Sequence, residues 1–193
     1  MVRWEPDSRA RLEQAALALF AERGFEGTTV AEIAARAGLT ERTFFRHFAD
    51  KREVLFDGAG TLQQLLVDTV AGAPESLTPI EAVAAAVEAA GAHLQERREF
   101  ARRRQAIIAA NTELRERELI KLASLSAALA DTLRTRGVEE PDASLTAEAG
   151  IAVFKVAFQR WVEQPDERDL PDLIRDSLDH LQTVTGVGGR GSR

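Results

Sequence analysis

Cysteine is absent from the 193 residues, and histidine occurs only three times. Without cysteine the chain has neither disulfide bonds nor thiolate metal sites. No apolar run approaches the ~20 residues that a membrane-spanning helix needs. The opening residues MVRWEPDSRARLEQ also lack the apolar stretch of a secretion signal. We therefore expect a cytoplasmic protein that has no membrane partner.

Sequence motifs of common enzyme classes are absent as well. The chain contains no Gly-x-Ser-x-Gly, HExxH or Walker loop. Residues 186–191 match the dinucleotide-binding pattern GxGxxG in their letters, but they follow a helical pattern rather than a strand. We expect residues 186–193 to be a flexible tail. We expect no catalytic residues, no metal site and no cofactor.

The spacing of apolar residues predicts an all-α protein with nine helices. Apolar residues recur three and four positions apart, and no segment alternates in the manner of a strand. Gly and Pro residues mark the breaks between helices. The helices are expected at residues 8–23, 30–37, 41–48, 51–70, 79–95, 97–110, 112–136, 143–163 and 170–184.

Residues 28–51, TTVAEIAARAGLTERTFFRHFADK, carry the most specific signal. They begin with the apolar stripe of a short helix, namely Val30, Ile33, Ala34 and Ala37. Thr29 and Glu32 match a capping box, which marks the start of this helix. Gly38 suits the left-handed residue that ends it, and Thr40 suits the N-cap of a second helix. Together these features predict a helix-turn-helix.

The second helix of this motif has one apolar face and one polar arc. Phe44 and Phe48 lie one turn apart and are expected to point inward. Arg42 and Arg46, on the exposed arc, are suited to bidentate contacts with guanine in the major groove. Thr43 offers a hydroxyl and a methyl group to a thymine. An arginine-rich arc also fits a purely solvated face, but here it coincides with the caps, the turn and the buried anchors.

Other polar residues of the motif lie at helix ends, where side chains hold phosphate and set the register on DNA. These residues are Thr29, Thr40, His47 and Lys51. His47 equally fits packing at a helix end. Phe45 fits either the core or a contact with the sugar-phosphate backbone.

The net charge of −6 is unevenly distributed. Residues 1–53 contain nine Lys or Arg and nine Asp or Glu, so the excess acid lies in residues 54–193. Residues 40–52 carry a net charge of +2. An acidic body with one locally positive face limits unspecific attachment to DNA and favours docking through that face.

Several short matches within residues 8–56 point to one known family: Gly24-Phe25, Thr28-Thr29-Val30, Ile33-Ala34, Ala37-Gly38 and the run Phe44 to Phe48 before Lys51. Through them the segment resembles the N-terminal domain of the TetR family of bacterial repressors. The resemblance implies a homodimer that binds a double-stranded DNA operator and responds to a small molecule. It assigns phosphate contacts to His47 and Lys51. The family commonly has Tyr at the position of Phe45, and this chain lacks that hydroxyl.

The last two predicted helices, residues 143–163 and 170–184, are apolar over more than one face. Such breadth indicates burial on two sides, one against the protomer and one against a second copy. A central helix pair in a larger monomer is the alternative. The residues expected at a dimer interface are Val153, Ala157, Ile174, Leu178 and Leu181.

Residues 54–140 are expected to hold most of the site for a small-molecule effector. The candidate lining residues are Leu62, Leu65, Leu66, Phe100, Arg103, Ile107, Phe158 and Trp161. Ordinary core packing explains the apolar members equally well. Arg103 belongs to a basic cluster that suits either an acidic head group or a solvated face. Residues 99–117 also resemble an actinobacterial branch of the family thought to respond to fatty acyl-CoA.

We therefore expect a ligand-responsive repressor with three parts. Residues 1–53 form the helix-turn-helix DNA-binding domain, residues 54–185 form the ligand-binding and dimerisation domain, and residues 186–193 form the tail. The helix expected at 51–70 would transmit the effector signal to the DNA-binding domain. The alternative is a helical protein-interaction module that does not bind DNA.

Overall fold

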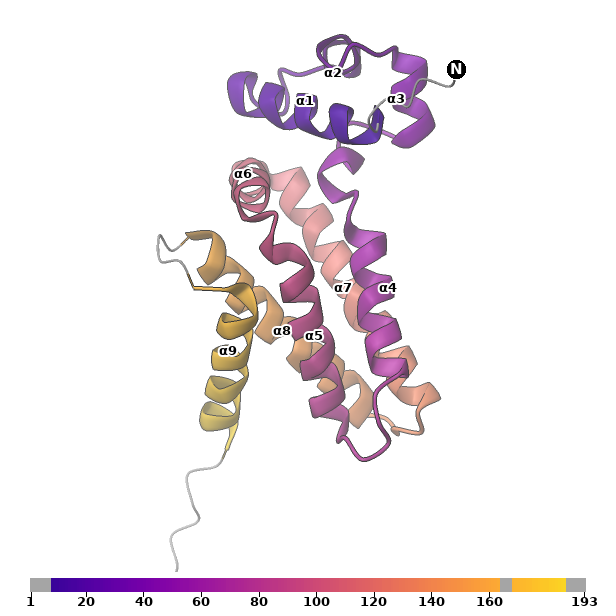
Figure 1. The fold of residues 1–193 in the computed structure, drawn as a ribbon, viewed down its shortest axis with the longest axis vertical. Coiled ribbons are helices and arrows are strands. Elements are labelled where there is room, and N and C mark those ends of the chain that lie inside the picture. The colour runs from indigo at the N-terminus through magenta and orange to yellow at the C-terminus, as the bar shows by residue number, and fades with distance from the viewer. Residues whose placement is uncertain (1–7, 164–167, 187–193) are drawn as a thin grey trace, which may run out of the picture. The chain divides into compact units, whose positions relative to one another are not determined.

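The computed structural model describes residues 8–163 and 168–186, and these residues form nine α-helices, one 3-10 turn and no strand (Figure 1). The prediction of an all-α fold is confirmed. Most of the predicted tail, from residue 187 onward, lies outside the described residues. The elements are α1 Ser8–Arg23, α2 Val30–Arg36, α3 Glu41–His47, η1 Glu53–Phe56, α4 Ala59–Ala71, α5 Pro79–Gln95, α6 Arg98–Ala109, α7 Thr112–Thr135, α8 Asp142–Glu163 and α9 Leu170–Thr185.

The single helix predicted over residues 51–70 is wrong, because the chain forms the separate turn η1 before α4. The Asp50 carboxylate accepts hydrogen bonds from the backbone N–H groups of Arg52 and Glu53, at 2.8 and 3.1 Å. This cap starts a short turn whose three residues Val54 to Phe56 are all buried. Gly58 follows between η1 and α4, and glycine disfavours a continuous helix through this junction.

The chain forms two compact units. The first comprises residues 1–59 and 99–119, and the second comprises residues 60–98 and 120–193. Helix α6 and the start of α7 therefore pack with the helix-turn-helix, although they follow it far along the chain. Helix α7 contributes residues to both units.

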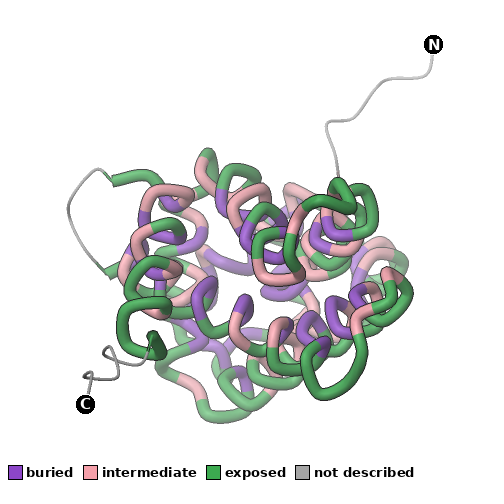
Figure 2. The backbone as a smooth tube through the Cα atoms, turned by 90° about the horizontal axis from the view of Figure 1, so that it is seen from below, coloured by how far each residue is buried: buried purple, intermediate pink, exposed green. Residues whose placement is uncertain are grey.

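The core of the first unit is built from the inward faces of α1, α2, α3, η1, α6 and α7. Its large buried side chains include Leu12, Leu19, Phe20, Phe44, Phe48, Val54, Phe56, Ile108 and Leu114. Figure 2 shows how buried positions recur on one side of successive helical turns. The ring centroids of Phe20 and Phe25 lie 5.0 Å apart, which attaches the loop after α1 to this core.

The second unit is organised around α5, α8 and α9, which lie side by side (Figure 1). Its fully buried residues include Leu129, Leu133, Trp161, Leu170, Leu173 and Ile174. Arg136, just after α7, caps the end of α4 by donating from Nη1 to the carbonyl oxygens of Val70 and Ala73, at 3.0 and 2.6 Å. None of the helices in the described part of the chain has the length and hydropathy that crossing a membrane requires.

Candidate nucleic-acid interface

The start of α2 has the capping box that the sequence predicts. Thr29 donates from both its hydroxyl and its backbone N–H to the Glu32 carboxylate at 2.9 Å, and its hydroxyl accepts from the Glu32 backbone N–H at 3.3 Å. The backbone and side-chain hydrogen bonds from Thr29 hold the pKa of Glu32 below its usual value. These bonds fix the first turn of α2, and the predicted capping box is confirmed.

The turn between α2 and α3 is held by a contact that the sequence pattern does not reveal. Gly38 has φ +66°, the left-handed conformation that ends α2. Arg11, from α1, donates from Nη2 to the carbonyl oxygen of Ala37 at 2.5 Å. The positive φ favours glycine at this position, whereas an added Cβ would meet only the end of the flexible Arg11 side chain, 2.9 Å from Nη2. Arg11 and Ala37 are 26 residues apart in the chain, so no local sequence pattern predicts this hydrogen bond.

Helix α3 presents the face that was predicted for it. Phe44 is fully buried and Phe48 is 3% exposed, which confirms their inward orientation. Arg42 and Arg46 are exposed, and Thr43 is half-buried. Phe45 is 55% exposed and packs edge-on against Phe44, with ring centroids 5.5 Å apart. Phe45 is therefore a surface residue and not part of the core.

Arg42 and Arg46 differ from most arginines of the first unit in their partners. The neighbouring ion pairs are Arg9 with Asp57, Arg23 with Glu32, Arg36 with Glu22, Arg52 with Asp50 and Glu113, Arg104 with Glu118, and Arg117 with Glu53. Arg42 and Arg46 form no ion pair with any residue in the described ranges 8–163 and 168–186. Their guanidinium groups are thus available to an external anion or base edge.

The predicted phosphate-binding residues already have partners within the protein. His47 Nε2 and Ser8 Oγ form a hydrogen bond at 2.8 Å. Thr40 Oγ1 accepts from the Thr43 backbone N–H at 3.2 Å and lies 3.0 Å from the Thr43 hydroxyl. Lys51 donates from Nζ to backbone carbonyl oxygens of the loop between α1 and α2. In the free protein these groups therefore position α2 and α3.

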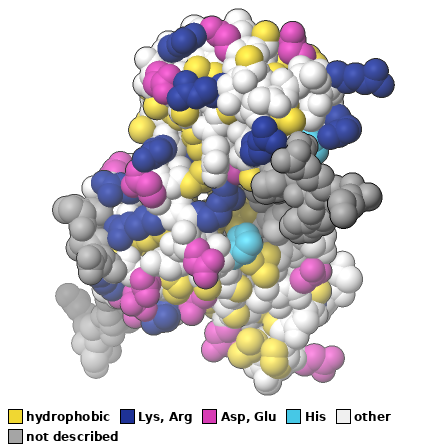
Figure 3. Space-filling view, turned by 45° about the horizontal axis from the view of Figure 1, so that its top comes forward, with side chains coloured by type: hydrophobic (Ala, Val, Ile, Leu, Met, Phe, Trp, Pro, Cys, Tyr) yellow, Lys and Arg dark blue, Asp and Glu magenta, His cyan; other side chains and the backbone are white. Residues whose placement is uncertain are grey.

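Charged side chains of both signs are scattered over the surface that faces the viewer in Figure 3. Lys and Arg alternate there with Asp and Glu, with hydrophobic side chains between them. The acidic excess of the chain is therefore not gathered into one block on this face.

The predicted effector-binding residues are divided between the two units. In the first unit Ile107 is buried in the core, Phe100 packs against that core, and exposed Arg103 pairs with Glu99. Core packing therefore accounts for Ile107 without a ligand. The other five belong to the second unit, namely Leu62, Leu65, Leu66, Phe158 and Trp161.

Trp161 is the most deeply buried aromatic residue of the second unit. Its side chain is fully buried, and its ring centroid lies 5.7 Å from that of Phe158. Arg98 donates from Nη2 to the Trp161 carbonyl oxygen at 2.9 Å, and its guanidinium carbon lies 5.6 Å from the Trp161 ring centroid. Trp161 thus joins α8 to the start of α6.

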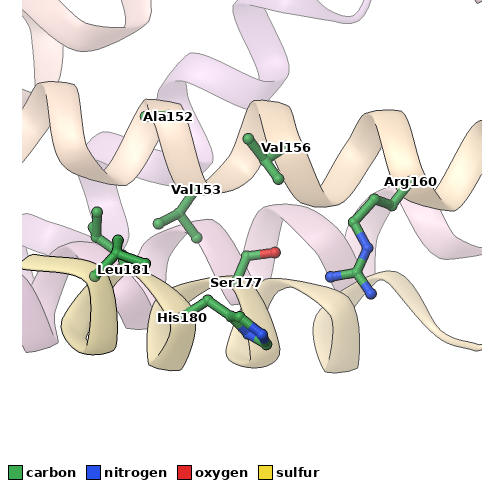
Figure 4. A pocket seen from close by; sticks show the side chains of 8 residues that line it. Ala152, Val153, Val156, Arg160, Ser177, His180 and Leu181 are labelled. Atoms are coloured by element: carbon green, nitrogen blue, oxygen red, sulfur yellow. The ribbon is translucent and has the colours of Figure 1, made fainter.

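A shallow apolar groove runs between α8 and α9 (Figure 4). Its lining residues are Ala152, Val153, Val156, Arg160, Ser177, His180, Leu181 and Val184. Figure 4 shows Val153 and Val156 on α8 above Ser177, His180 and Leu181 on α9, with Arg160 at one end. Val156 is 52% exposed and Val184 is 77% exposed.

The residues predicted for the dimer interface take different positions around this groove. Val153 and Leu181 line it, and Leu178 is half-buried. Ala157 and Ile174 are fully buried within the protomer, so their side chains belong to its own core. The sequence did not single out Val156 and Val184, because an apolar pattern alone does not tell which of two apolar faces the protomer covers.

Two family models match the chain. The model described as "Bacterial regulatory proteins, tetR family" matches residues 13–57, and "MftR C-terminal domain" matches residues 77–186. The HTH-type transcriptional regulator TcmR of Streptomyces glaucescens is 35% identical over 82 residues, which are 42% of this chain and 36% of that protein. The HTH-type transcriptional repressor KstR2 of Mycobacterium tuberculosis is 45% identical over 47 residues, 24% of each chain. The chain thus spans about a third or less of the length of these curated relatives.

Solved structures share the fold over nearly the whole chain. The transcriptional regulator FadR from Bacillus subtilis, solved in complex with stearoyl-CoA, matches with a TM-score of 0.65 at 21% identity. The match covers 92% of this chain and 98% of FadR. Known proteins similar to this chain are transcriptional regulators and not enzymes. With its helix-turn-helix geometry and a family model covering residues 77–186, the chain belongs to the TetR family of transcriptional regulators.

Proposed function

We propose that this protein is a repressor that binds a near-palindromic DNA operator as a homodimer and is released from it by a small amphipathic effector. One observation carries the DNA-binding part of this proposal. Arg42 and Arg46 lie exposed on α3 without an ion-pair partner in the described chain, whereas most arginines around them are paired. Unpaired guanidinium groups on a short helix suit bidentate recognition of guanine.

Residues beside the two arginines complete the proposed contact surface. The methyl group of Thr43 is suited to a thymine, and exposed Phe45 to the sugar-phosphate backbone. Thr29, Thr40 and His47 would contact phosphate through side chains that now bond within the protein.

The groove between α8 and α9 supports the homodimer. Val156 and Val184 expose apolar side chains on it, and burial of such surface against a second copy is favourable. A dimer brings two α3 helices to one duplex, with half-sites about 34 Å apart or a multiple of that spacing. Each α3 reads only a few base pairs, so the second copy supplies the remaining specificity.

For the effector we propose a fatty acyl-CoA. FadR of Bacillus subtilis, which has the same fold, was solved with stearoyl-CoA. Apolar residues proposed for the acyl chain are Leu62, Leu65, Leu66, Phe158 and Trp161, all in the second unit. Effector binding and DNA binding would then oppose each other, with a coupling of about 1–3 kcal/mol.

Selection of bound sequences from random double-stranded DNA tests the DNA-binding function. We expect a twofold-symmetric site. Arg42→Ala and Arg46→Ala should each weaken binding to this site by about tenfold, since a bidentate base contact contributes about 1–3 kcal/mol. Arg103→Ala removes the same charge from α6 and should leave DNA affinity unchanged. Unaltered binding by both α3 variants would support the protein-interaction module instead.

The effector is tested on the selected operator. Lauroyl-CoA and stearoyl-CoA should release the protein from this DNA, while free coenzyme A serves as the control for the head group alone. If an acyl-CoA binds tightly but leaves operator affinity unchanged, it is not the inducer.

A further inference from the structure

The indole N–H of Trp161 on α8 is a buried hydrogen-bond donor without an acceptor. The side chain is 0% exposed, and its Nε1 has no hydrogen-bond partner in the part of the chain that the structure describes. A buried tryptophan normally directs this N–H at an acceptor, because a donor that is removed from water and left unpaired carries its full desolvation cost. An exception of this kind indicates a partner from outside the protein.

The side chains known to contact the indole cannot accept its proton. The guanidinium carbon of Arg98 lies 5.6 Å from the ring centroid, and Arg98 Nη2 donates to the Trp161 carbonyl oxygen at 2.9 Å. A guanidinium has no acceptor, and the indole N–H lies in the plane of the ring rather than on the face that Arg98 covers. Phe158, whose ring centroid lies 5.7 Å from that of Trp161, has no acceptor either.

Two half-buried side chains connect the indole with the surface of the second unit. They are Phe158 and Arg98, and both belong to this unit together with Trp161. Phe154 stacks on Phe158, with ring centroids 6.0 Å apart and an interplanar angle of 25°. An aromatic surface therefore continues along α8, and a ligand that moves the Phe158 ring aside would reach the indole along it.

We propose that the Trp161 indole N–H is the polar anchor of the effector site and donates a hydrogen bond to the thioester carbonyl oxygen of a fatty acyl-CoA. This inference rests on the effector proposed above and names the contact that recognises it. The thioester carbonyl is the acceptor joined directly to the acyl chain, so it can enter apolar surroundings with the chain while the charged phosphates of coenzyme A stay in water. Phe158 and Phe154 then pack against the first part of the chain.

The test compares two ligands that differ only in this acceptor. Lauroyl-CoA carries the thioester carbonyl, whereas the thioether S-dodecyl-CoA has a methylene group in its place. Calorimetry measures the binding of each ligand to the full-length parent and to Trp161→Phe, which keeps an aromatic ring and lacks the N–H. The parent should bind lauroyl-CoA about tenfold more tightly than the thioether, because the carbonyl pairs the buried donor. Trp161→Phe should bind the two ligands with equal affinity.

Phe158→Leu is the control variant, since it changes the apolar surface and leaves the N–H in place. It should weaken both ligands alike and keep the preference for the thioester. Equal affinities of the parent for the two ligands would overturn the proposal even if Trp161→Phe does not fold, and would fit an internal water as the partner of the N–H. A preference for the thioester that persists in Trp161→Phe would overturn it as well.

The N–H group itself provides a readout that altered packing does not imitate. The other tryptophan of the chain is Trp4, so nitrogen-labelled Trp4→Phe protein has a single indole N–H resonance. Lauroyl-CoA should move this proton resonance downfield, as expected for a new hydrogen bond, and the thioether should not. The same shift with both ligands would count against the carbonyl as the acceptor.

Two further results distinguish this inference from the proposed function. Laurate places a carboxylate where the thioester would lie, and tighter binding of laurate than of lauroyl-CoA would assign the site to a free fatty acid. If lauroyl-CoA releases the protein from the operator but binds no more tightly than the thioether, the effector is correct and the role of Trp161 is wrong. If lauroyl-CoA does not bind the parent, the proposed effector itself is wrong.

Discussion

The side chain of Val83 on α5 fills the space beside the backbone of Gly150 on α8. A Cβ at Gly150 would lie 2.2 Å from Cγ1 of Val83 and 3.6 Å from its Cβ. A β-branched side chain cannot turn away from such a contact without leaving its preferred rotamer. Gly150 therefore permits the close approach of α5 and α8 in the second unit.

Gly150→Ala is expected to destabilise the protein by about 1–3 kcal/mol, because overpacking this contact outweighs the better helix propensity of alanine. Thermal unfolding should show a midpoint several degrees lower. Gly60→Ala is the matched control, since no atom lies within 4 Å of its added Cβ, and it should be neutral or slightly stabilising. Equal midpoints for the two variants would mean that the contact with Val83 relaxes at little cost.

Arg104 on α6 is expected to be a main stabilising contact of the first unit. Its Nε donates to the carbonyl oxygen of buried Leu55 at 2.5 Å, its Nη1 contacts Glu118 at 3.1 Å, and its guanidinium lies over the Phe56 ring at 5.0 Å. Burial lowers the pKa of Arg104, an effect that the charge of Glu118 opposes. Arg104→Met should cost about 2–3 kcal/mol of unfolding free energy, since it leaves a buried carbonyl and a partly buried carboxylate without their donor.

Arg103→Met is the natural control for this measurement. Its side chain is 65% exposed and its ion pair with Glu99 joins positions i and i+4 of the same helix. Exposed pairs of this kind contribute about 0.3–0.5 kcal/mol. Chemical denaturation should therefore show a clearly larger loss of unfolding free energy for Arg104→Met than for Arg103→Met, although the two arginines are adjacent in sequence. A similar small loss for both would show that Arg104 is not a significant support of the unit.

Local spacing was sufficient to predict much of the helix-turn-helix. The capping box of Thr29 and Glu32 and the inward orientation of Phe44 and Phe48 involve residues three or four positions apart. Such pairs depend on helix geometry alone, so sequence determines them directly. The capping box of Thr78 and Glu81 at the N-terminus of α5 follows from local spacing in the same way.

Contacts between distant segments were beyond the reach of these patterns. The bond from Arg11 to the Ala37 carbonyl oxygen and the contacts of Lys51 with the loop of residues 24–29 depend on tertiary packing. In α9, the apolar residue Ile174 suited a dimer interface equally well, but α5 covers it at Gly91. Periodicity gives the apolar face of a helix and leaves open which neighbour buries it.

Acidic pH should weaken the N-terminus of α5. The Thr78 hydroxyl and backbone N–H both donate to the Glu81 carboxylate at 2.7 Å, and these bonds lower the pKa of Glu81 from 4.5. Because the folded-state pKa is the lower one, the contribution of Glu81 to stability is complete above the unfolded pKa and is lost as pH falls through the folded value.

The measurement compares the unfolding midpoints of the parent and Glu81→Gln at about pH 7 and about pH 3. Glutamine keeps an oxygen acceptor but not the charge, so the parent should be more stable near neutrality and the difference should shrink in acid. Glu75→Gln makes the same chemical change at an exposed position before the cap. If the difference in unfolding midpoint between the parent and Glu81→Gln is the same at both pH values, the charge of Glu81 does not have the stabilising role assigned to it.

The groove between α8 and α9 gives the sharpest test of the proposed homodimer. Val156 is half-exposed on this apolar surface, one turn before Arg160 and close to His180 (Figure 4). Val156→Lys would place a second cation beside Arg160. In a twofold-symmetric dimer both copies would carry this added charge at the interface. Burying these charges unpaired is costly, so the dimer should dissociate at concentrations where the parent remains dimeric.

Sedimentation velocity measures this dissociation directly. Ala85→Lys is the control, because Ala85 is exposed on α5 and does not line the groove. Dissociation also has a distinctive consequence for DNA binding. A monomer still carries one α3, so Val156→Lys should retain the parent's weak affinity for an isolated half-site while losing its tighter binding to the symmetric operator. A variant that remains dimeric would place the interface on another face. A variant that loses half-site binding as well would indicate damage to the first unit rather than to assembly.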